Sequence, residues 1–206
     1  MTKWSIVTVL AVATSLSQSP QIRGQSSLGK RVDPFTRPTE QRIKPPADTP
    51  AGRAATNACP ATQDDMCQKF WALGSYFLNN NKIPARDREL LTLRTAWLTR
   101  GEYIWSVHHA GYAIKAGLTA EEVARVTKGP DAKDWSPFEA ALLRAVDELQ
   151  ASRFISDGTW KALGERYRDR QRLEVVLTVG NYTMLAMYFN STGAPLAPGN
   201  TGLPPD

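Results

Sequence analysis

The sequence predicts an all-α protein with a single domain of six or seven helices. Apolar residues recur at helical spacing through the middle of the chain, and no run between turn signals alternates with the period of two that a half-buried strand shows. The 14 prolines cluster towards the two ends, and few fall between Ile83 and Gly193. At 206 residues, with six tryptophans and 42% apolar residues, the chain can form one domain with a real core and tails at both ends.

Three helices are predicted in the first half of the domain. Apolar residues at helical spacing cover residues 64–80, where a run of asparagines ends the pattern. Pro84 stands at the favoured early position of the second helix, whose broad apolar stripe ends at Gly101. The third helix spans about residues 102–116 and stops at Gly117, a residue typical of helix C-caps.

The second half of the domain carries clear helix start signals. Capping boxes at Thr119–Glu122 and Ser136–Glu139 predict a short helix over 123–126 and an amphipathic helix after the second box. Another helix follows Ser156. The last predicted helix, residues 170–190, is apolar nearly all round, so we expect it at the centre of the fold or at a subunit interface.

The two ends of the chain differ from this domain. A short charged start, an apolar run from Ser5 to Leu16 and a polar exit fit a secretory signal peptide, because a bilayer-spanning helix needs about 20 apolar residues. The alternative is an uncleaved amphipathic or buried segment. We therefore predict export to the periplasm or the outside of the cell, with no stable membrane span after processing. The predicted organisation is a signal peptide over 1–25 without a clear cleavage site, a Pro-rich basic arm or linker over 26–57, the helical domain over 58–193 and a C-terminal coil over 194–206.

The formal net charge of +5 belongs to the leader and the arm. Seven basic and three acidic residues lie between Arg23 and Arg53, whereas 17 basic and 17 acidic residues from Ala54 onwards cancel. A nucleic-acid surface needs Lys and Arg clustered on one face. The neutral helical domain therefore argues against nucleic acid as a partner.

The chain has two cysteines, Cys59 and Cys67, with seven residues between them. A redox-active pair is normally close-spaced and has a lowered thiol pKa, so the spacing favours a structural role. In an exported protein the two could form a disulfide that pins the arm to the first helix.

One stretch holds the best candidates for chemistry. It contains both histidines of the chain, His108 and His109, and Glu89 lies nineteen positions before the first of them. The helix break at Gly101 lets a carboxylate on one helix face an imidazole on the next. Such a pair is a workable acid–base unit, because the carboxylate fixes the imidazole tautomer and raises its basicity.

Other interpretations of this stretch stay open. Glu89 could instead pair with Arg86 or Arg94 on its own helix, while the histidines complete a polar helix face. A metal site is not predicted, because adjacent histidines point about 100° apart on a helix and no further ligand motif supports them. Aromatic side chains nearby could be core or could line a small apolar pocket. The candidate catalytic residues are Glu89, His108 and His109, and the candidate substrate-binding residues are Tyr103, Trp105 and Arg94.

Three stretches carry a family resemblance: RDRELLTLRTAWLTRGEYIWSVHHAGYAIKAGLTAEEVARV, GPDAKDWSPFEAALLRAVDEL and ISDGTWKALGERY…LEVVLTVGNYTMLAMYFNSTG. They cover roughly residues 65–193 in order, and the chain resembles the carboxymuconolactone decarboxylase-like family. The resemblance implies an AhpD-like all-α fold, shared with the AhpD-type alkyl hydroperoxidases, and assembly into homo-oligomers such as trimers or hexamers. It does not imply one reaction.

The hydroperoxidase branch of this family has a Glu, eleven residues, a C-x2-C motif, three residues and a His. Laid on this sequence, Glu89 and His108 take the Glu and His positions, and the cysteine positions are Gly101 and Ile104. Without a thiolate there is no peroxidatic nucleophile, so the sequence argues against hydroperoxidase activity.

The decarboxylase branch, by resemblance, acts on small lactone carboxylates without a metal or organic cofactor and uses a histidine for proton transfer. Counting from Glu89 favours His108 for this role, whereas counting back from residues 116–118 favours His109. We therefore predict cofactor-free acid–base chemistry of the lyase or isomerase type on a small organic acid or lactone. The alternatives are an AhpD-like hydroperoxidase and a non-catalytic oligomeric binding protein.

Overall fold

The structure is a computed structural model that describes residues 38, 40–47, 57–196 and 199–205. The predicted signal peptide and most of the predicted arm lie outside the described residues. Within these ranges the chain forms seven helical segments and no strand, which confirms the predicted fold class. The segments are α1 (Asp65–Asn79), α2 (Ala85–Leu98), the continuous run of α3 (Glu102–Val107), the π-helix η2 (His108–Tyr112) and α4 (Ala113–Lys115), then α5 (Ala120–Val126), α6 (Pro137–Ser152), α7 (Asp157–Gly164) and α8 (Asp169–Thr192). Over the same ranges, we find no helix that combines the length and the apolar character needed to cross a membrane.

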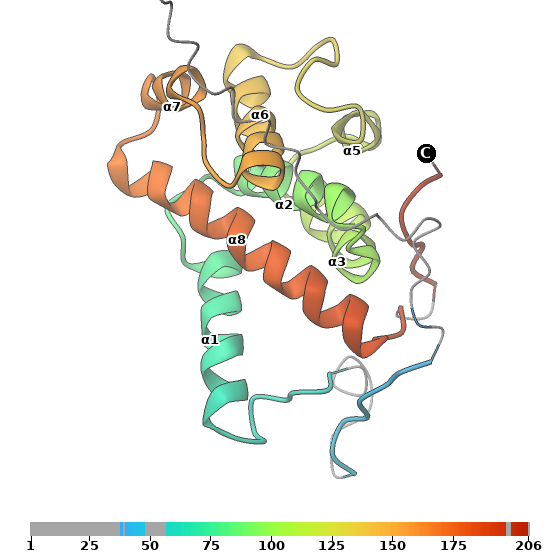
Figure 1. The fold of residues 1–206 in the computed structure, drawn as a ribbon. Coiled ribbons are helices and arrows are strands. Elements are labelled where there is room, and N and C mark those ends of the chain that lie inside the picture. Colours follow the sequence, from blue (N-terminus) through green and yellow to red (C-terminus); the bar gives the residue numbers. More distant parts are fainter. Residues whose placement is uncertain (1–37, 39, 48–56, 197–198, 206) are drawn as a thin grey trace, which may run out of the picture. The chain divides into compact units, whose positions relative to one another are not determined.

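Helix α2 lies at the centre of the helical domain (Figure 1). It packs against α6 and α8, and the turn at its end leads into α3. Two apolar clusters meet at α2, with Leu90 and Leu93 in the cluster shared with α3 and α8, and Leu91 in the cluster shared with α6 and α7. Residues 89–96 are all buried, so an unpaired charged side chain among them would cost much free energy.

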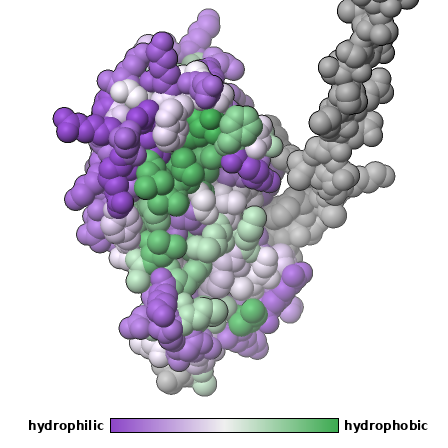
Figure 2. All heavy atoms as spheres, turned by 60° about the vertical axis from the view of Figure 1, so that its left-hand side comes forward, coloured by the Kyte–Doolittle hydropathy of each residue, from purple (hydrophilic) through white to green (hydrophobic). Residues whose placement is uncertain are grey.

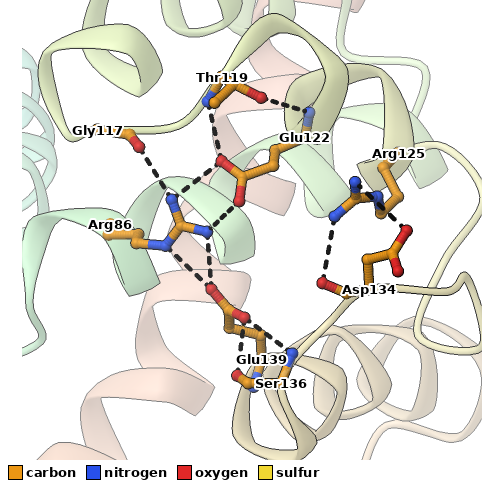
Figure 3. A network of polar contacts seen from close by, with 8 residues as sticks. All are labelled: Arg86, Gly117, Thr119, Glu122, Arg125, Asp134, Ser136 and Glu139. Atoms are coloured by element: carbon orange, nitrogen blue, oxygen red, sulfur yellow. Dashed lines mark hydrogen bonds and ion pairs between the residues drawn. The ribbon is translucent and has the colours of Figure 1, made fainter.

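The two predicted capping boxes form, and one arginine of α2 joins them (Figure 3). Thr119 and Glu122 cap α5, and Ser136 and Glu139 cap α6. Arg86 donates to Glu122 Oε1 at 2.6 Å and to Glu139 Oε1 at 2.9 Å. The hydrogen bond from Arg86 holds the pKa of Glu122 below its usual value. The two contacts of Arg86 thus join the N-termini of α5 and α6 to the central helix α2.

The two sides of α8 have different surroundings. One side is buried against α2 and α3 and includes Tyr182, Leu185 and Phe189. The other side exposes four large apolar side chains, Leu173, Leu177, Met184 and Met187. Figure 2 shows apolar side chains gathered in a band across one face of the molecule. Only one side of α8 therefore lies in the core of the fold. Its predicted role in a subunit interface stays a prediction.

Cys59 and Cys67 form a disulfide, with their Cα atoms 5.4 Å apart. The disulfide joins the segment before α1 to the first turn of that helix. Trp71 of α1 donates from Nε1 to the carbonyl of Cys59, and Tyr188 of α8 donates its hydroxyl to Asn57 Oδ1 at 2.8 Å. The segment that enters α1 is thus fixed against both α1 and α8.

Candidate active site

Glu89 of α2 and His108 of η2 meet inside the domain. Glu89 Oε2 lies 2.7 Å from His108 Nδ1, Glu89 is fully buried, and His108 is 5% exposed. A tight turn between α2 and α3 brings them together, because Arg100 adopts the left-handed conformation with φ 54°. Gly101 follows in the turn, where an added Cβ would lie 3.1 Å from the Cβ of Ala186 on α8. The turn therefore returns the chain along α2, as the helix break predicted.

The Glu89 carboxylate fixes the tautomer of the neutral His108 ring. Because an ionised carboxylate only accepts hydrogen bonds, Nδ1 carries the proton and Nε2 is the basic nitrogen. The second oxygen of Glu89, Oε1, accepts from Arg88 Nε at 3.1 Å. A buried carboxylate needs such partners to compensate its lost hydration. Glu89 thus holds His108 in one orientation, with the basic nitrogen directed away from the carboxylate.

The other two arginines of α2 have different partners, so the interpretation that Glu89 pairs with Arg86 or Arg94 is wrong. Arg86 binds the glutamates of the capping boxes. Arg94 forms two hydrogen bonds to Asp147, at 2.7 and 3.0 Å, and donates to the carbonyls of residues 126 and 127 at the end of α5. Arg94 lines neither of the two cavities described below, because its guanidinium is used to close the C-terminus of α5.

The backbone around His108 departs from the α-helix. Residues 108–112 form a π-helix, and the N–H of Ala113 donates to the carbonyl of His108, five residues earlier. The ring centroids of His108 and Tyr112 are 4.9 Å apart. Such single π turns inside α-helices are frequent at functional sites. The π turn widens the helix where the Glu89–His108 pair forms.

His108 faces a cavity of about 460 Å³ between α1, α3, η2 and α8. This volume falls within the range of small-molecule sites, about 300–1,000 Å³. Tyr103 and Phe189 stack at 4.0 Å on one wall, and the Tyr182 ring meets His108 edge-on at 5.3 Å. The described lining of this His108 cavity is Asn57, Trp71, Gly74, Ser75, Leu78, Asn79, Tyr103, Ile104, Val107, His108, Tyr112, Tyr182, Leu185 and Phe189.

Tyr182 is a wall residue that contacts His108 and lies within the electrostatic influence of Glu89. Burial, and then the nearby Glu89 carboxylate, raise the pKa of Tyr182 well above its usual value. The side chain therefore stays a neutral phenol at physiological pH. Its hydroxyl can donate a hydrogen bond but carries no charge into the cavity wall.

His109 lies beside a second cavity, of about 570 Å³, on the other side of the same helical run. Its Nδ1 lies 2.8 Å from the carbonyl oxygen of Trp105, and its Nε2 lies 3.3 Å from Thr201 Oγ1 in the C-terminal segment. Trp105, a predicted substrate-binding residue, stacks on His109 and lines this His109 cavity, whereas Tyr103 lines the His108 cavity. The structure therefore brings together Glu89, His108 and Tyr103, and separates them from His109 and Trp105.

Several wall residues of the His108 cavity were not among the candidates from sequence. Trp71 comes from α1, and Tyr182 and Phe189 come from α8, far from the histidines in the chain. Their apolar periodicity indicates a buried helix face but not which cavity that face lines. Among the described residues, no group of three His, Cys, Asp or Glu side chains comes together as a metal site would require.

Solved structures share this fold. A protein of unknown function from Agrobacterium tumefaciens, described as a putative antioxidant defence protein AhpD, matches with a TM-score of 0.59 at 15% identity, over 64% of this chain and 90% of that one. An uncharacterised peroxidase-related protein from Silicibacter sp. TM1040 matches with a TM-score of 0.59 at 12% identity, over 78% and 94%. A variant of the debrominase Bmp8 in complex with 2,3,4-tribromopyrrole matches with a TM-score of 0.57 at 13% identity, over 66% and 73%. At these identities the likeness shows the fold alone.

Fold and site together define an AhpD-like helical domain with a buried Glu–His pair beside an aromatic cavity. Residues 60–148 match the model of the carboxymuconolactone decarboxylase family, and this range includes Glu89 and both histidines. This match covers 89 of the 206 residues and agrees with the family resemblance predicted from the sequence. No curated protein matches the chain.

Proposed function

We propose that the protein catalyses cofactor-free acid–base chemistry of the lyase or isomerase type on a small organic acid or lactone. The observation that carries this proposal is the Glu89–His108 contact of 2.7 Å at the wall of the His108 cavity. His108 Nε2 is the proton acceptor and donor. Glu89 is a positioning residue, because it acts on the substrate only through the imidazole.

The proposed reaction begins when His108 Nε2 removes a proton from a carbon beside the substrate carbonyl. The electron pair of the broken C–H bond moves towards the carbonyl, and negative charge develops on its oxygen. In this proposal a tyrosine hydroxyl of the described wall donates to that oxygen. The imidazolium then returns the proton at another atom, which gives an isomer. In the lyase reaction the former C–H electron pair forms a C=C double bond, and the leaving group departs with the pair of its own broken bond and takes the proton from the imidazolium.

An AhpD-like hydroperoxidase, the first alternative, has weaker support. That chemistry needs a reactive thiolate and a resolving thiol. Gly101 and Ile104 occupy the expected cysteine positions, and Cys59 is bonded to Cys67, which is 1% exposed. Dithiol-dependent reduction of cumene hydroperoxide by the wild type, lost in the Cys59→Ser, Cys67→Ser protein, would instead favour this alternative.

The neighbouring histidines provide a matched test of the proposal. His108→Gln and His109→Gln make the same chemical change at adjacent positions of one helical run. In a screen of lactones and their acids, we expect His108→Gln to lower kcat by about 10²–10⁴-fold, the range for general acid–base groups. His109→Gln should retain turnover within about three-fold. Unchanged turnover in both variants, with unchanged melting temperatures, would contradict the proposal and favour a non-catalytic binding protein.

We propose in addition that the protein is exported and works as a homo-oligomer. The disulfide between Cys59 and Cys67 suits an oxidising compartment. The exposed apolar residues of α8, at positions 173, 177, 184 and 187, follow the spacing of a helix that packs against a second helix. Both observations support these parts of the proposal, and the family resemblance suggests trimers or hexamers.

A further inference from the structure

We infer that the His108 cavity selects an uncharged ring compound, such as a neutral lactone, over the corresponding carboxylate. This inference rests on the proposed function, because it takes the His108 cavity as the substrate site. It decides between the two substrate classes that the acid–base proposal leaves open.

The described wall of the His108 cavity contains no lysine or arginine. Its polar members other than His108 are three tyrosines and the uncharged residues Asn57, Ser75 and Asn79. Small-molecule sites usually hold an anionic group with a few placed donors or a cation. A carboxylate in this cavity would lose much of its hydration and find no charged partner among the described residues.

The arginines near the acid–base pair do not supply the missing charge. Arg88 donates from Nε to Glu89 Oε1 at 3.1 Å, its Nη2 forms an ion pair with the same oxygen at 3.1 Å, and its side chain is only 12% exposed. Arg86 and Arg94 are held by carboxylates of other helices. Their positive charges are therefore already compensated. The Arg88–Glu89 pair next to His108 has no net charge with which to attract an anion.

The aromatic wall favours a neutral ring. Trp71, Tyr103, Tyr182 and Phe189 present ring faces and edges to the cavity, and aromatic groups prefer stacked or edge-to-face partners. Tyr182 is buried among them as an uncharged phenol, so it adds a donor without a charge. A flat, uncharged lactone or enone can stack here and still present an acidic C–H bond to His108.

The test uses an aryl-substituted butenolide that carries a carboxylic acid group, together with the methyl ester of that acid. Isothermal titration calorimetry at pH 7.5 measures the affinity of the protein for each compound. We expect the ester to bind wild-type protein at least ten-fold more tightly than the acid. Lowering the pH below the carboxyl pKa of the ligand should reduce this gap. Equal or tighter binding of the acid, or binding of neither compound, would overturn the inference.

A charge placed in the wall sharpens this test. Ser75 is exposed and lines the cavity, so Ser75→Arg adds a cation at its edge with little risk to folding. Ala72→Arg is the matched control, since Ala72 is exposed on the same helix but does not line the cavity. We expect Ser75→Arg to tighten binding of the acid at least ten-fold and Ala72→Arg to change it by less than two-fold. An equal response of the two variants contradicts the inference.

Binding and turnover separate this inference from the proposed function. His108→Gln should keep the preference for the ester, because the charges of the wall are unchanged. If the wild type binds the ester selectively but turns over no lactone, the acid–base proposal fails and the charge selection stands. If the protein turns over a lactone but binds the acid more tightly than the ester, the charge selection fails and the acid–base proposal stands.

Discussion

Two adjacent histidines of one helical run occupy contrasting environments. His108 pairs with a buried carboxylate through Nδ1, and its ring faces an aromatic cavity. His109 contacts a backbone carbonyl through Nδ1 and the hydroxyl of Thr201 through Nε2. Consecutive residues on a helix point about 100° apart, so neighbours in sequence reach different sides of the domain. A histidine thus becomes a candidate base through its partners rather than through its position in a motif.

The largest expected effect comes from removing the partner of each histidine in turn. Glu89→Gln should lower kcat by about 10²–10⁴-fold with little change in KM, because the amide no longer fixes the Nδ1–H tautomer. Thr201→Val removes the hydroxyl near His109 and should change kcat by less than three-fold. Steady-state kinetics on the best lactone from the screen would measure both. Similar losses in the two variants would remove the distinction between the histidines.

The disulfide lies on the His108 side, where it holds the segment that contributes Asn57 to the cavity. It closes a loop with a sequence separation of 8, for which chain entropy predicts about 2–3 kcal/mol of stabilisation. Cys59→Ser with Cys67→Ser should lower the free energy of unfolding by this amount and weaken ester binding. Urea unfolding and calorimetry would check both. An unchanged ester affinity would show that the segment does not shape the cavity.

Arg86 stabilises the His109 side, where it joins the capping boxes of α5 and α6 (Figure 3). Arg86→Met should lower the free energy of unfolding by about 1–2 kcal/mol, because Glu122 and Glu139 lose a charged partner. Turnover at the His108 cavity should change little at temperatures where the variant is folded. Loss of kcat without loss of stability would place Arg86 in the catalytic machinery instead.

For Tyr182, which contacts His108, we predict a smaller, pH-dependent effect on the free energy of unfolding. Burial and the Glu89 carboxylate raise its pKa above the ordinary value of 10.0, so the unfolded chain releases this proton first as the pH rises. Above pH 10 the folded state then binds more protons, and this residue should lower the free energy of unfolding by at most about 1.4 kcal/mol per pH unit. Below pH 10 it should contribute no pH dependence. Urea unfolding from pH 8 to 11 should show a shallower alkaline loss for Tyr182→Phe than for the wild type, and equal losses would contradict the assignment.

Much of the helical framework could be predicted from the sequence because its signals are local. The capping boxes at Thr119 and Ser136 start helices where predicted, and the break at Gly101 turns the chain as expected. The end of the last helix was predicted two residues early, at Asn190 rather than Thr192, since helix ends depend on packing as well as on local preference. The Glu89–His108 pair was one of the alternatives that residue type and spacing left open.

The sequence by itself determined the fold class, the family resemblance and the small set of residues able to transfer protons. Tertiary structure decided which of them meet. Glu89 selects His108 because α2 and η2 pack with those side chains facing each other, and Arg94 is drawn to Asp147 by the packing of α2 against α6. The cavity wall combines α1, α3, η2 and α8, and its members Trp71 and Phe189 lie 118 residues apart in the chain. Helix periodicity reports which face is apolar, but only the long-range packing of the helices determines what that face encloses.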